Sequence, residues 1–347
     1  MATLKDIARL AGVSVSTVSR SLRDQGRIPL ETRQRIKDLA LEHNLELNSA
    51  ARSLSTQRTQ TVGLVYPEFE NGYHKSSYLD LLVHELRIEM TAKGFDCLIF
   101  QAEGPVTSNI TRLVRQKKID GLILIMAETQ KETWDVLEKV RFPLVQVHTK
   151  PLFRGTAPRG ENFDYFYTDN HMGGQIAGRH LLEAGCSNPI CLGDEIHVPE
   201  MLERTRGFMD ALLEAGIRPT SGQVLNCSSS FDGAYKFVLQ NADLFRSVDG
   251  IFAHTDLMAV AVLQALSDSG RRVPNQVKVI GFDDVPLCRM VRPSLTTIHQ
   301  PREEQAKRAS QRLVEIIEEG PQDPLVQEYL PPSLVVRGST KGDFIHV

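Results

Sequence analysis

The sequence predicts an α/β protein with a small all-α head followed by a larger core of two doubly wound parallel sheets. Two short helices with apolar stripes, at residues 4–11 and 15–22, open the chain. From residue 61 onward, strands alternate with helices, which is typical of parallel βαβ units. The roughly 285 residues of this second part exceed a single such sheet, so we expect two.

The first helix has recognisable signals at both ends. Thr3 is positioned as its N-cap, and Asp6 lies three residues later, where a capping box places its second member. Gly12 follows the helix, and glycine tolerates the left-handed backbone that commonly ends one. The apolar stripe between these two signals consists of Leu4, Ile7, Ala8 and Ala11.

The second helix presents a thin polar face. Ser14 is a natural N-cap, with Val13 and Val18 at the two positions of a hydrophobic staple, and Val18 and Leu22 point inward. The opposite face carries Val15, Ser16, Ser19 and Arg20. Two short helices joined by a glycine turn form a helix-turn-helix pattern, whose second helix is built to lie in a DNA major groove. The alternative is a small helical hairpin inside another kind of domain.

The two parts of the chain differ in charge. Residues 1–60 hold ten Lys or Arg residues against six Asp or Glu residues, a net charge of +4, whereas the whole chain carries −3. A basic head on an acidic body suits a phosphate-facing module joined to a domain of another kind.

The composition predicts a cytoplasmic globular protein. Apolar residues make up 41% and charged residues 24% of the 347 residues, and no apolar run approaches the length of a membrane span. The N-terminus shows no secretion signal. The five cysteines are scattered without a CxxC motif, which indicates reduced thiols. We therefore expect no metal ion and no cofactor; a zinc site built from Cys186 and Cys191 is the disfavoured alternative.

A polar connector is expected to join the head to the core. A third helix should run from Glu31 to about His43, and residues 44–60 follow it. Within this connector Asn48 can cap a very short helix that carries Ala51 and Leu54 on one side. A helix of about seven residues is marginal alone in water, so it should form only against a partner.

The core pattern places strands at about 62–66, 96–100, 121–125, 144–147, 190–192, 250–253, 277–282 and 334–336. Helices are expected at about 78–93, 107–117, 130–139, 171–185, 201–215, 231–240, 256–269 and 303–319. The segments IDGLILI (119–125) and VDGIFAH (248–254) echo each other, which favours two similar halves. In open α/β sheets ligands bind outside the carboxyl ends of the strands, so two facing sheets would form a cleft there.

Eight segments share one order and spacing with a known family. They are TLKDIARLAGVSVSTVSR (3–20), NSAARSLST (48–56), DNHMGGQIAGRHLLEAG (169–185), ERTRGFMDALLEAGI (203–217), TDLMAVAVLQAL (255–266), VIGFDD (279–284), LTTIHQP (295–301) and LVVRGST (334–340). Through them nearly the whole chain resembles the lactose-repressor (LacI/GalR) family of bacterial transcription regulators.

The resemblance implies a homodimer that binds palindromic operator DNA and a small-molecule effector. Each subunit would carry a DNA-binding domain (1–46), a hinge helix and linker (47–60) and a core like the periplasmic sugar-binding proteins (61–347). The core would have two lobes joined by three crossings. The N-lobe would hold about 61–163 and 300–326, and the C-lobe about 164–299 and 327–347. No leucine heptads follow Val336, so a dimer is expected rather than a tetramer.

The resemblance also implies the residues that contact DNA. Val15, Ser16 and Arg20 would read base edges, with Arg20 bound to a guanine. Leu54, with Ala51 beside it, would enter the minor groove as a wedge, or else pack on the core or lie idle in the linker. Phosphates would be bound by Thr3, Thr17, Ser19 and Asn48, although a solvated helix face is the alternative for Ser19.

A second set of residues is implied for the effector. Arg204 and Asp283 would bind vicinal hydroxyls, or else form a salt bridge between the lobes with no ligand role. His148 stands where many relatives carry Asp, and it can both donate and accept. Phe231 would stack on the ligand ring or pack in the core. Other ligand contacts would come from Thr255 and, if their loop is not simply solvated, from Glu68, Asn71 and Tyr73. Asp256 is expected to cap the helix that follows it.

The prediction is therefore a sequence-specific repressor of carbohydrate uptake or catabolism genes, controlled by a small sugar. A purine- or nucleoside-responsive repressor of the same family is the alternative, because Arg204 and Asp283 do not exclude it. A transport binding protein would need an export signal and would lack the helix-turn-helix. An enzyme is not expected, because no GxGxxG follows the first strand and no GxSxG, P-loop or HExxH motif is present.

Overall fold

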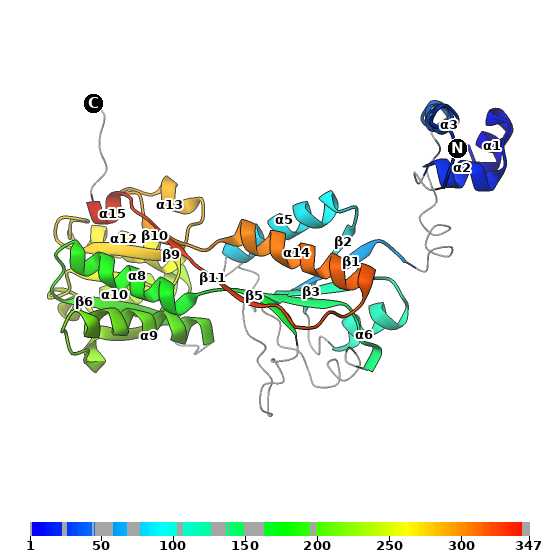
Figure 1. Ribbon diagram of the computed structural model, residues 1–347. Coiled ribbons are helices and arrows are strands. Elements are labelled where there is room, and N and C mark those ends of the chain that lie inside the picture. Colours follow the sequence, from blue (N-terminus) through cyan, green and yellow to red (C-terminus); the bar gives the residue numbers. More distant parts are fainter. Residues whose placement is uncertain are drawn as a thin grey trace. The chain divides into compact units, whose positions relative to one another are not determined.

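The computed structural model describes residues 2–22, 26–43, 45, 58–67, 77–102, 107–125, 137, 139–148, 163–194 and 199–341. The chain forms two compact units, the head (residues 1–60) and the core (residues 61–347), both traced in Figure 1. Across the described ranges, no helix has the length and apolar character needed to cross a membrane.

The head contains the three expected helices, α1 (Leu4–Ala11), α2 (Val15–Leu22) and α3 (Leu30–Glu42). The capping box at Thr3 is confirmed, because Thr3 Oγ1 accepts from the Asp6 amide at 3.3 Å and Asp6 Oδ2 accepts from the Thr3 amide at 2.9 Å. Gly12 has the left-handed φ of 66° that its place after α1 requires. The core of the head consists of Ile7, Ala8, Ala11, Val18 and Ile36.

The N-lobe of the core is built on a parallel six-stranded sheet in the order β11-β5-β4-β3-β1-β2. Its strands are β1 (Thr61–Pro67), β2 (Asp96–Ala102), β3 (Gly121–Ile125), β4 (Leu144–Val147), β5 (Asp164–Thr168) and β11 (Gln327–Leu330). Its helices are α5 (Ser77–Ala92), α6 (Thr107–Arg115) and α14 (Arg302–Glu319). Alternate residues of β3 face opposite layers: Ile123 packs with α5, and Leu122 packs with α6.

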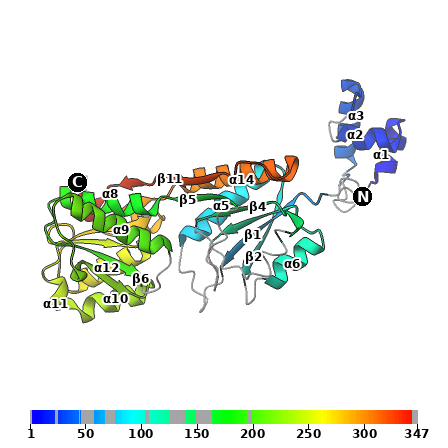
Figure 2. The same cartoon turned by 60° about the horizontal axis from the view of Figure 1, so that its bottom comes forward.

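The C-lobe repeats this plan in the sheet β12-β10-β9-β8-β6-β7, in which only β12 runs antiparallel to its neighbour. Its strands are β6 (Pro189–Asp194), β7 (Val224–Cys227), β8 (Gly250–Ala253), β9 (Lys278–Asp283), β10 (Thr296–His299) and β12 (Ser333–Val335). Its helices are α8 (Asn170–Glu183), α9 (Pro199–Glu214), α10 (Phe231–Gln240), α11 (Ala242–Phe245), α12 (Asp256–Asp268), α13 (Leu287–Met290) and α15 (Gly338–Lys341), with the 3-10 turn η2 (Ser221–Gln223). Figure 2 shows α8 and α9 on one face of the sheet and α10 and α12 on the other.

The predicted echo of two halves is confirmed, because β3 and β8 are each fourth in the order of their sheet. The expected helix at about 130–139 lies mostly outside the described residues. The expected lobe boundaries are wrong by a few residues. β5 pairs with β4 and β11, so residues 164–168 and 327–330 belong to the N-lobe sheet. Strand pairing decides this, because the sequence of a strand does not by itself specify which of the two sheets the strand joins.

Candidate functional sites in the head and the core

In the head, α2 turns its predicted DNA-facing side to solvent. Val15 is 40% exposed although it is apolar, and Ser16 and Arg20 are also exposed. Ser19 and Thr17 are half-buried. The hydroxyl of Ser14 lies 2.7 Å from that of Ser16 and 2.8 Å from that of Thr17, and it also accepts from the Thr17 amide. Ser14 at the N-cap of α2 therefore fixes Ser16 and Thr17 at the start of this face.

Other predicted contact residues are not placed on this surface. The Thr3 hydroxyl is exposed, but it is engaged with Asp6 in the capping box. The remaining DNA-facing predictions, Asn48, Ala51 and Leu54, and the effector predictions Glu68, Asn71 and Tyr73 lie outside the described residues.

In the core, Arg204 of α9 is the centre of a buried polar cluster at the carboxyl ends of the C-lobe strands. Its side chain is 1% exposed. Nε donates to Asn170 Oδ1 at 2.8 Å, and Nη1 donates to the backbone oxygen of His254. The guanidinium also lies 3.7 Å above the centroid of the Phe282 ring, a cation–π contact. Together with the carboxylate of Asp283, these three groups hold the guanidinium in one orientation.

Asp283, the last residue of β9, places its carboxylate opposite this guanidinium. Its Oδ1 lies 4.0 Å from Arg204 Nη1 and accepts from Gln300 Nε2 at 2.7 Å. Its φ of 127° is a strained backbone for a residue other than glycine, and such strain gathers at functional sites. Burial raises the pKa of Asp283 to about 6, although the charge of Arg204 opposes that rise. The prediction that these two residues face each other is confirmed.

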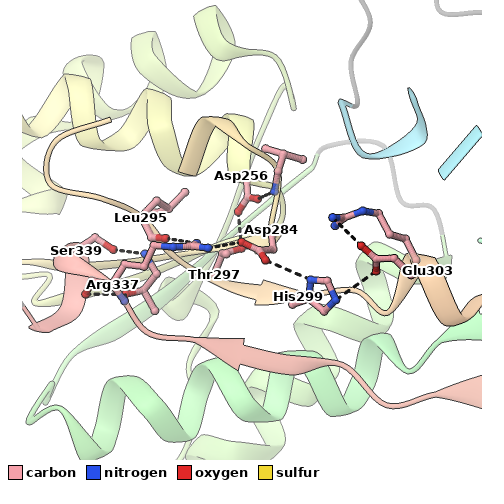
Figure 3. Close-up of polar contacts among 11 residues, drawn as sticks. Asp256, Asp284, Leu295, Thr297, His299, Glu303, Arg337 and Ser339 are labelled. Carbon is pink, nitrogen blue, oxygen red and sulfur yellow. Dashed lines mark hydrogen bonds and ion pairs between the residues drawn. The ribbon is translucent and has the colours of Figure 1, made fainter. Parts of the chain in front are cut away.

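Asp256 and Thr255 have roles that differ from those expected. Thr255 is the N-cap of α12, because its hydroxyl accepts from the Met258 amide at 3.2 Å. Asp256 is fully buried instead, where it accepts from Thr297 Oγ1 at 2.5 Å and from the Val285 amide at 2.9 Å. Figure 3 shows Asp256 and Thr297 side by side. The expected cap at Asp256 is therefore wrong by one residue, and Asp256 ties α12 to β10 and to the segment after β9.

His148 lies at the carboxyl end of β4, on the N-lobe side of this place. Its ring stands 5.1 Å from that of Tyr78, a buried residue of α5 whose hydroxyl donates to Gln305 Oε1. Burial, together with the charge of Arg204, lowers the pKa of His148 to about 3, so the imidazole is neutral near pH 7. A neutral imidazole has one donor and one acceptor nitrogen, as expected for this position.

Buried polar atoms without a partner gather at the carboxyl ends of the N-lobe strands and at the crossings. Within the described residues, His148 Nδ1, Tyr167 Oη and Gln300 Oε1 are buried without a hydrogen-bond partner. A small cavity is lined by His148, Tyr167 and Asn170, the last of which also binds Arg204. Native proteins rarely leave such atoms unpaired, so this concentration indicates a place for a polar ligand or ordered water.

Phe231 packs in the core, which was one of its two expected roles. It is half-buried, packs against the C-lobe core and stacks on Tyr235 at 6.1 Å between ring centroids. Sequence reasoning missed Tyr78, Tyr167, Asn170 and Gln300. The sequence signals for them were that Asn170 and Gln300 lie in the DNH and HQP parts of segments that resemble the LacI family, and nothing in the sequence marked Tyr78.

Comparisons with known proteins agree with this arrangement. Residues 3–47 match the family described as bacterial regulatory proteins, lacI family, and residues 179–340 match a periplasmic binding protein-like domain. The chain is 29% identical to the ribose operon repressor of Escherichia coli K12, over 98% of this chain and 100% of that protein. It is 27% identical to the transcriptional repressor PurR of Photobacterium profundum, over 98% and 99%.

A solved structure is similar over the same length. The complex of the transcriptional regulator CelR with cellobiose has a TM-score of 0.71 and 27% identity, and the match covers 98% of this chain and 100% of that one. The helix-turn-helix head, the two-lobed core and these full-length repressor relatives agree with one another. The chain belongs to the LacI family of bacterial transcription regulators.

Proposed function

We propose that this chain is a repressor that binds a palindromic operator as a homodimer and whose affinity for that operator is set by a small sugar. The observation that supports a sugar effector is the buried polar cluster around Arg204 in the core. The Arg204 and Asp283 pair lies next to neutral His148 and to Tyr167 and Gln300, whose side-chain oxygens have no hydrogen-bond partner within the described residues. Such a mixture of donors and acceptors suits a ligand rich in hydroxyl groups.

Relatives point to two effector classes. The ribose operon repressor and the CelR–cellobiose complex are named for sugars, whereas PurR is named for purines. A purine base offers a flat ring without vicinal hydroxyl groups, whereas the Arg204 and Asp283 pair suits hydroxyls. We therefore propose the sugar and keep the purine as the second candidate. The repressor names of the relatives also support a binding protein with no catalytic step.

On the DNA side, we propose that α2 reads the operator. Arg20 would bind a guanine edge, and Val15 and Ser16 would contact neighbouring bases. Thr3, Thr17, Ser19 and Asn48 would bind phosphates, which sets register without reading sequence. A dimer predicts two half-sites separated by about one helical turn, roughly 34–36 Å.

Ligand and DNA binding would be coupled through the hinge. The proposed effector changes the angle between the lobes, and this changes the spacing at which the two hinge helices of a dimer can fold together on DNA. The effector must prefer one of the two states, with a coupling of about 1–3 kcal/mol. The sign, inducer or corepressor, follows from which state it prefers.

The decisive experiment screens ribose, cellobiose, adenine and hypoxanthine for a shift in melting temperature, since a ligand of the folded state raises it. Each compound that shifts melting is then tested for its effect on binding of labelled operator DNA, selected from random palindromes. We expect at least one sugar to act in both assays. A response to purines alone would contradict the sugar proposal.

A second test addresses the hinge. Leu54→Ala should weaken operator binding well over tenfold, because an apolar wedge in the minor groove stabilises the kinked duplex. Effector binding should stay unchanged, as measured by the same melting shift. Operator affinity equal to that of the unmodified protein would refute the wedge.

A further inference from the structure

Arg302, the first residue of α14, lies where the chain crosses from the C-lobe to the N-lobe, and its charge is only partly paired. Its side chain is 15% exposed, and Nη2 lies 2.9 Å from Glu303 Oε1. Nε and Nη1 are buried and have no hydrogen-bond partner within the described part of the chain. A buried guanidinium with two unpaired nitrogens is costly, and charged donors carry a larger penalty than neutral ones.

The position of Arg302 is set by a chain of polar contacts that runs from Arg337 through Asp284 and His299 to Glu303, drawn in Figure 3. Arg337 Nη2 lies 2.6 Å from Asp284 Oδ1, and Asp284 Oδ2 lies 3.2 Å from His299 Nδ1. His299 Nε2 is in turn 3.7 Å from Glu303 Oε2. Glu303 is therefore shared between His299 and Arg302, and its side chain is 52% exposed. It contacts Arg302 through Nη2, whereas Nε and Nη1 have no hydrogen-bond partner within the described residues.

The same guanidinium acts on the candidate effector site. Its charge lowers the pKa of Asp283 and of Tyr78, both of which are buried around Arg204, against the larger rise that burial causes. Gln300, two residues before Arg302, binds Asp283 directly. Gln305, three residues after Arg302, accepts from the Tyr78 hydroxyl, so Arg302 lies between two residues that bind groups of this site. The two arginines differ in their partners. The guanidinium of Arg204 contacts Asn170, Asp283 and Phe282, whereas Nε and Nη1 of Arg302 have no hydrogen-bond acceptor within the described residues.

We infer that Arg302 binds a negatively charged group of the effector, so that the ligand is an anionic sugar, either a sugar phosphate or a sugar acid. An anion is the acceptor that a guanidinium binds most strongly. It would pair with the nitrogens of Arg302 that Glu303 does not contact. The inference rests on the proposed function, since it names the class of sugar that the same site takes.

The test compares each neutral sugar with its anionic counterparts. Ribose is paired with ribose 5-phosphate, glucose with glucose 6-phosphate and with glucuronate, and inorganic phosphate is tested alone. Dissociation constants are measured by calorimetry on the full chain, on Arg302→Met, on Arg302→Lys and on Arg308→Met. Arg308 is the matched control, because it lies on the same helix but is exposed and bound to Glu304 and Glu328.

We expect one anionic sugar to bind at least about tenfold more tightly than its neutral counterpart, and Arg302→Met to abolish that preference while Arg308→Met preserves it. Arg302→Lys keeps the charge and should keep part of the preference, which guards against a Met variant that merely misfolds. The phosphate and glucuronate arms show which anion is bound.

Several results would overturn the inference. These are equal binding of neutral and anionic sugars, an anion preference that survives Arg302→Met, no response to any anionic sugar, and inorganic phosphate binding as tightly as a sugar phosphate. Binding of neutral sugars alone would leave the proposed function standing. Binding of purine bases to the exclusion of every sugar would refute the proposed function as well.

Discussion

The two lobes of the core share one strand order but prepare the candidate effector site differently. On the C-lobe side most polar groups are bound to one another: Arg204 to Asn170 and to the backbone of His254, and Asp283 to Gln300, whose Oε1 alone of these atoms has no partner within the described residues. On the N-lobe side, His148 Nδ1 and Tyr167 Oη have no hydrogen-bond partner within the described residues. One half of the site is thus assembled by the fold, and the other half has bonds left for a ligand to complete.

This difference separates two kinds of energetic role. Removing a buried group that is already bonded leaves its partners unpaired, so both folding and ligand binding should weaken. Removing an unbonded group loses nothing that the free protein has, so only ligand binding should weaken. Four variants, taken from the largest expected effect to the smallest, test whether the lobes really divide in this way.

Arg204→Met should have the largest effect. It leaves Asp283 buried without its guanidinium, which should lower the free energy of unfolding by about 3–5 kcal/mol. Effector affinity should fall on the order of a hundredfold. Denaturant unfolding and ligand titration measure both, with Arg206→Met, an exposed arginine on the same helix, as the matched control. If Arg204→Met were as stable as the control, the bonded groups of the C-lobe side would not contribute to stability as proposed.

Asp283→Asn should change how stability depends on pH. Burial raises the pKa of Asp283 from 3.8 to about 6, so the folded protein holds this proton more tightly than the unfolded chain does. Its contribution to stability is therefore fully present below about pH 4 and is lost as the pH rises through 6. Between pH 4.5 and 7.5 the unfolding free energy of the unmodified protein should fall relative to that of Asp283→Asn.

Ligand binding should show the opposite trend at this residue. If the carboxylate of Asp283 accepts from effector hydroxyls, affinity should decline as the pH drops below 6, and Asp283→Asn should bind weakly at every pH. Parallel pH profiles for the two proteins would show that this carboxyl group does not titrate in the site.

His148→Phe should weaken effector binding about tenfold with little loss of stability. Phenylalanine keeps an aromatic ring beside Tyr78 but removes the nitrogen that has no partner in the free protein. Melting temperature and ligand titration separate the two quantities. A large drop in melting temperature would show that His148 already contributes to the fold, contrary to the proposed division.

Tyr167→Phe should have the smallest effect. It deletes a single buried hydroxyl that has no hydrogen-bond partner among the described residues, so stability should be unchanged or slightly higher. Effector affinity should fall by a factor of about three to ten, provided the ligand reaches the cavity that Tyr167 lines. Unchanged affinity would show that the ligand does not contact Tyr167. His148 would then be the one residue of the two that binds the ligand on the N-lobe side.

Local sequence signals predicted the head and most of the core elements well. The capping box at Thr3, the turn at Gly12 and the central strands β3 and β8 all follow from short-range rules, since a strand buried on both faces must be apolar throughout. The strands β5, β7, β10 and β11 were missed. Edge strands such as β7 (VLNC) and β11 (QEYL) are short and partly exposed, so neither shows a clear apolar period.

The sequence by itself determined the helix-turn-helix and the two repeated sheets, because these depend on periodicity, and its resemblance to the LacI family predicted the opposed Arg204 and Asp283. Only the tertiary structure decided that Thr255 rather than Asp256 caps α12, that Phe231 packs on Tyr235, that Tyr78 stacks near His148, that Tyr167 lines a cavity with His148, and that Arg302 is partly buried with two unpaired nitrogens within the described residues. Tyr78, Tyr167 and Arg302 belong to segments far apart in the chain. Their neighbourhood arises from strand pairing and from the three crossings between lobes, and no local pattern encodes a contact of that kind.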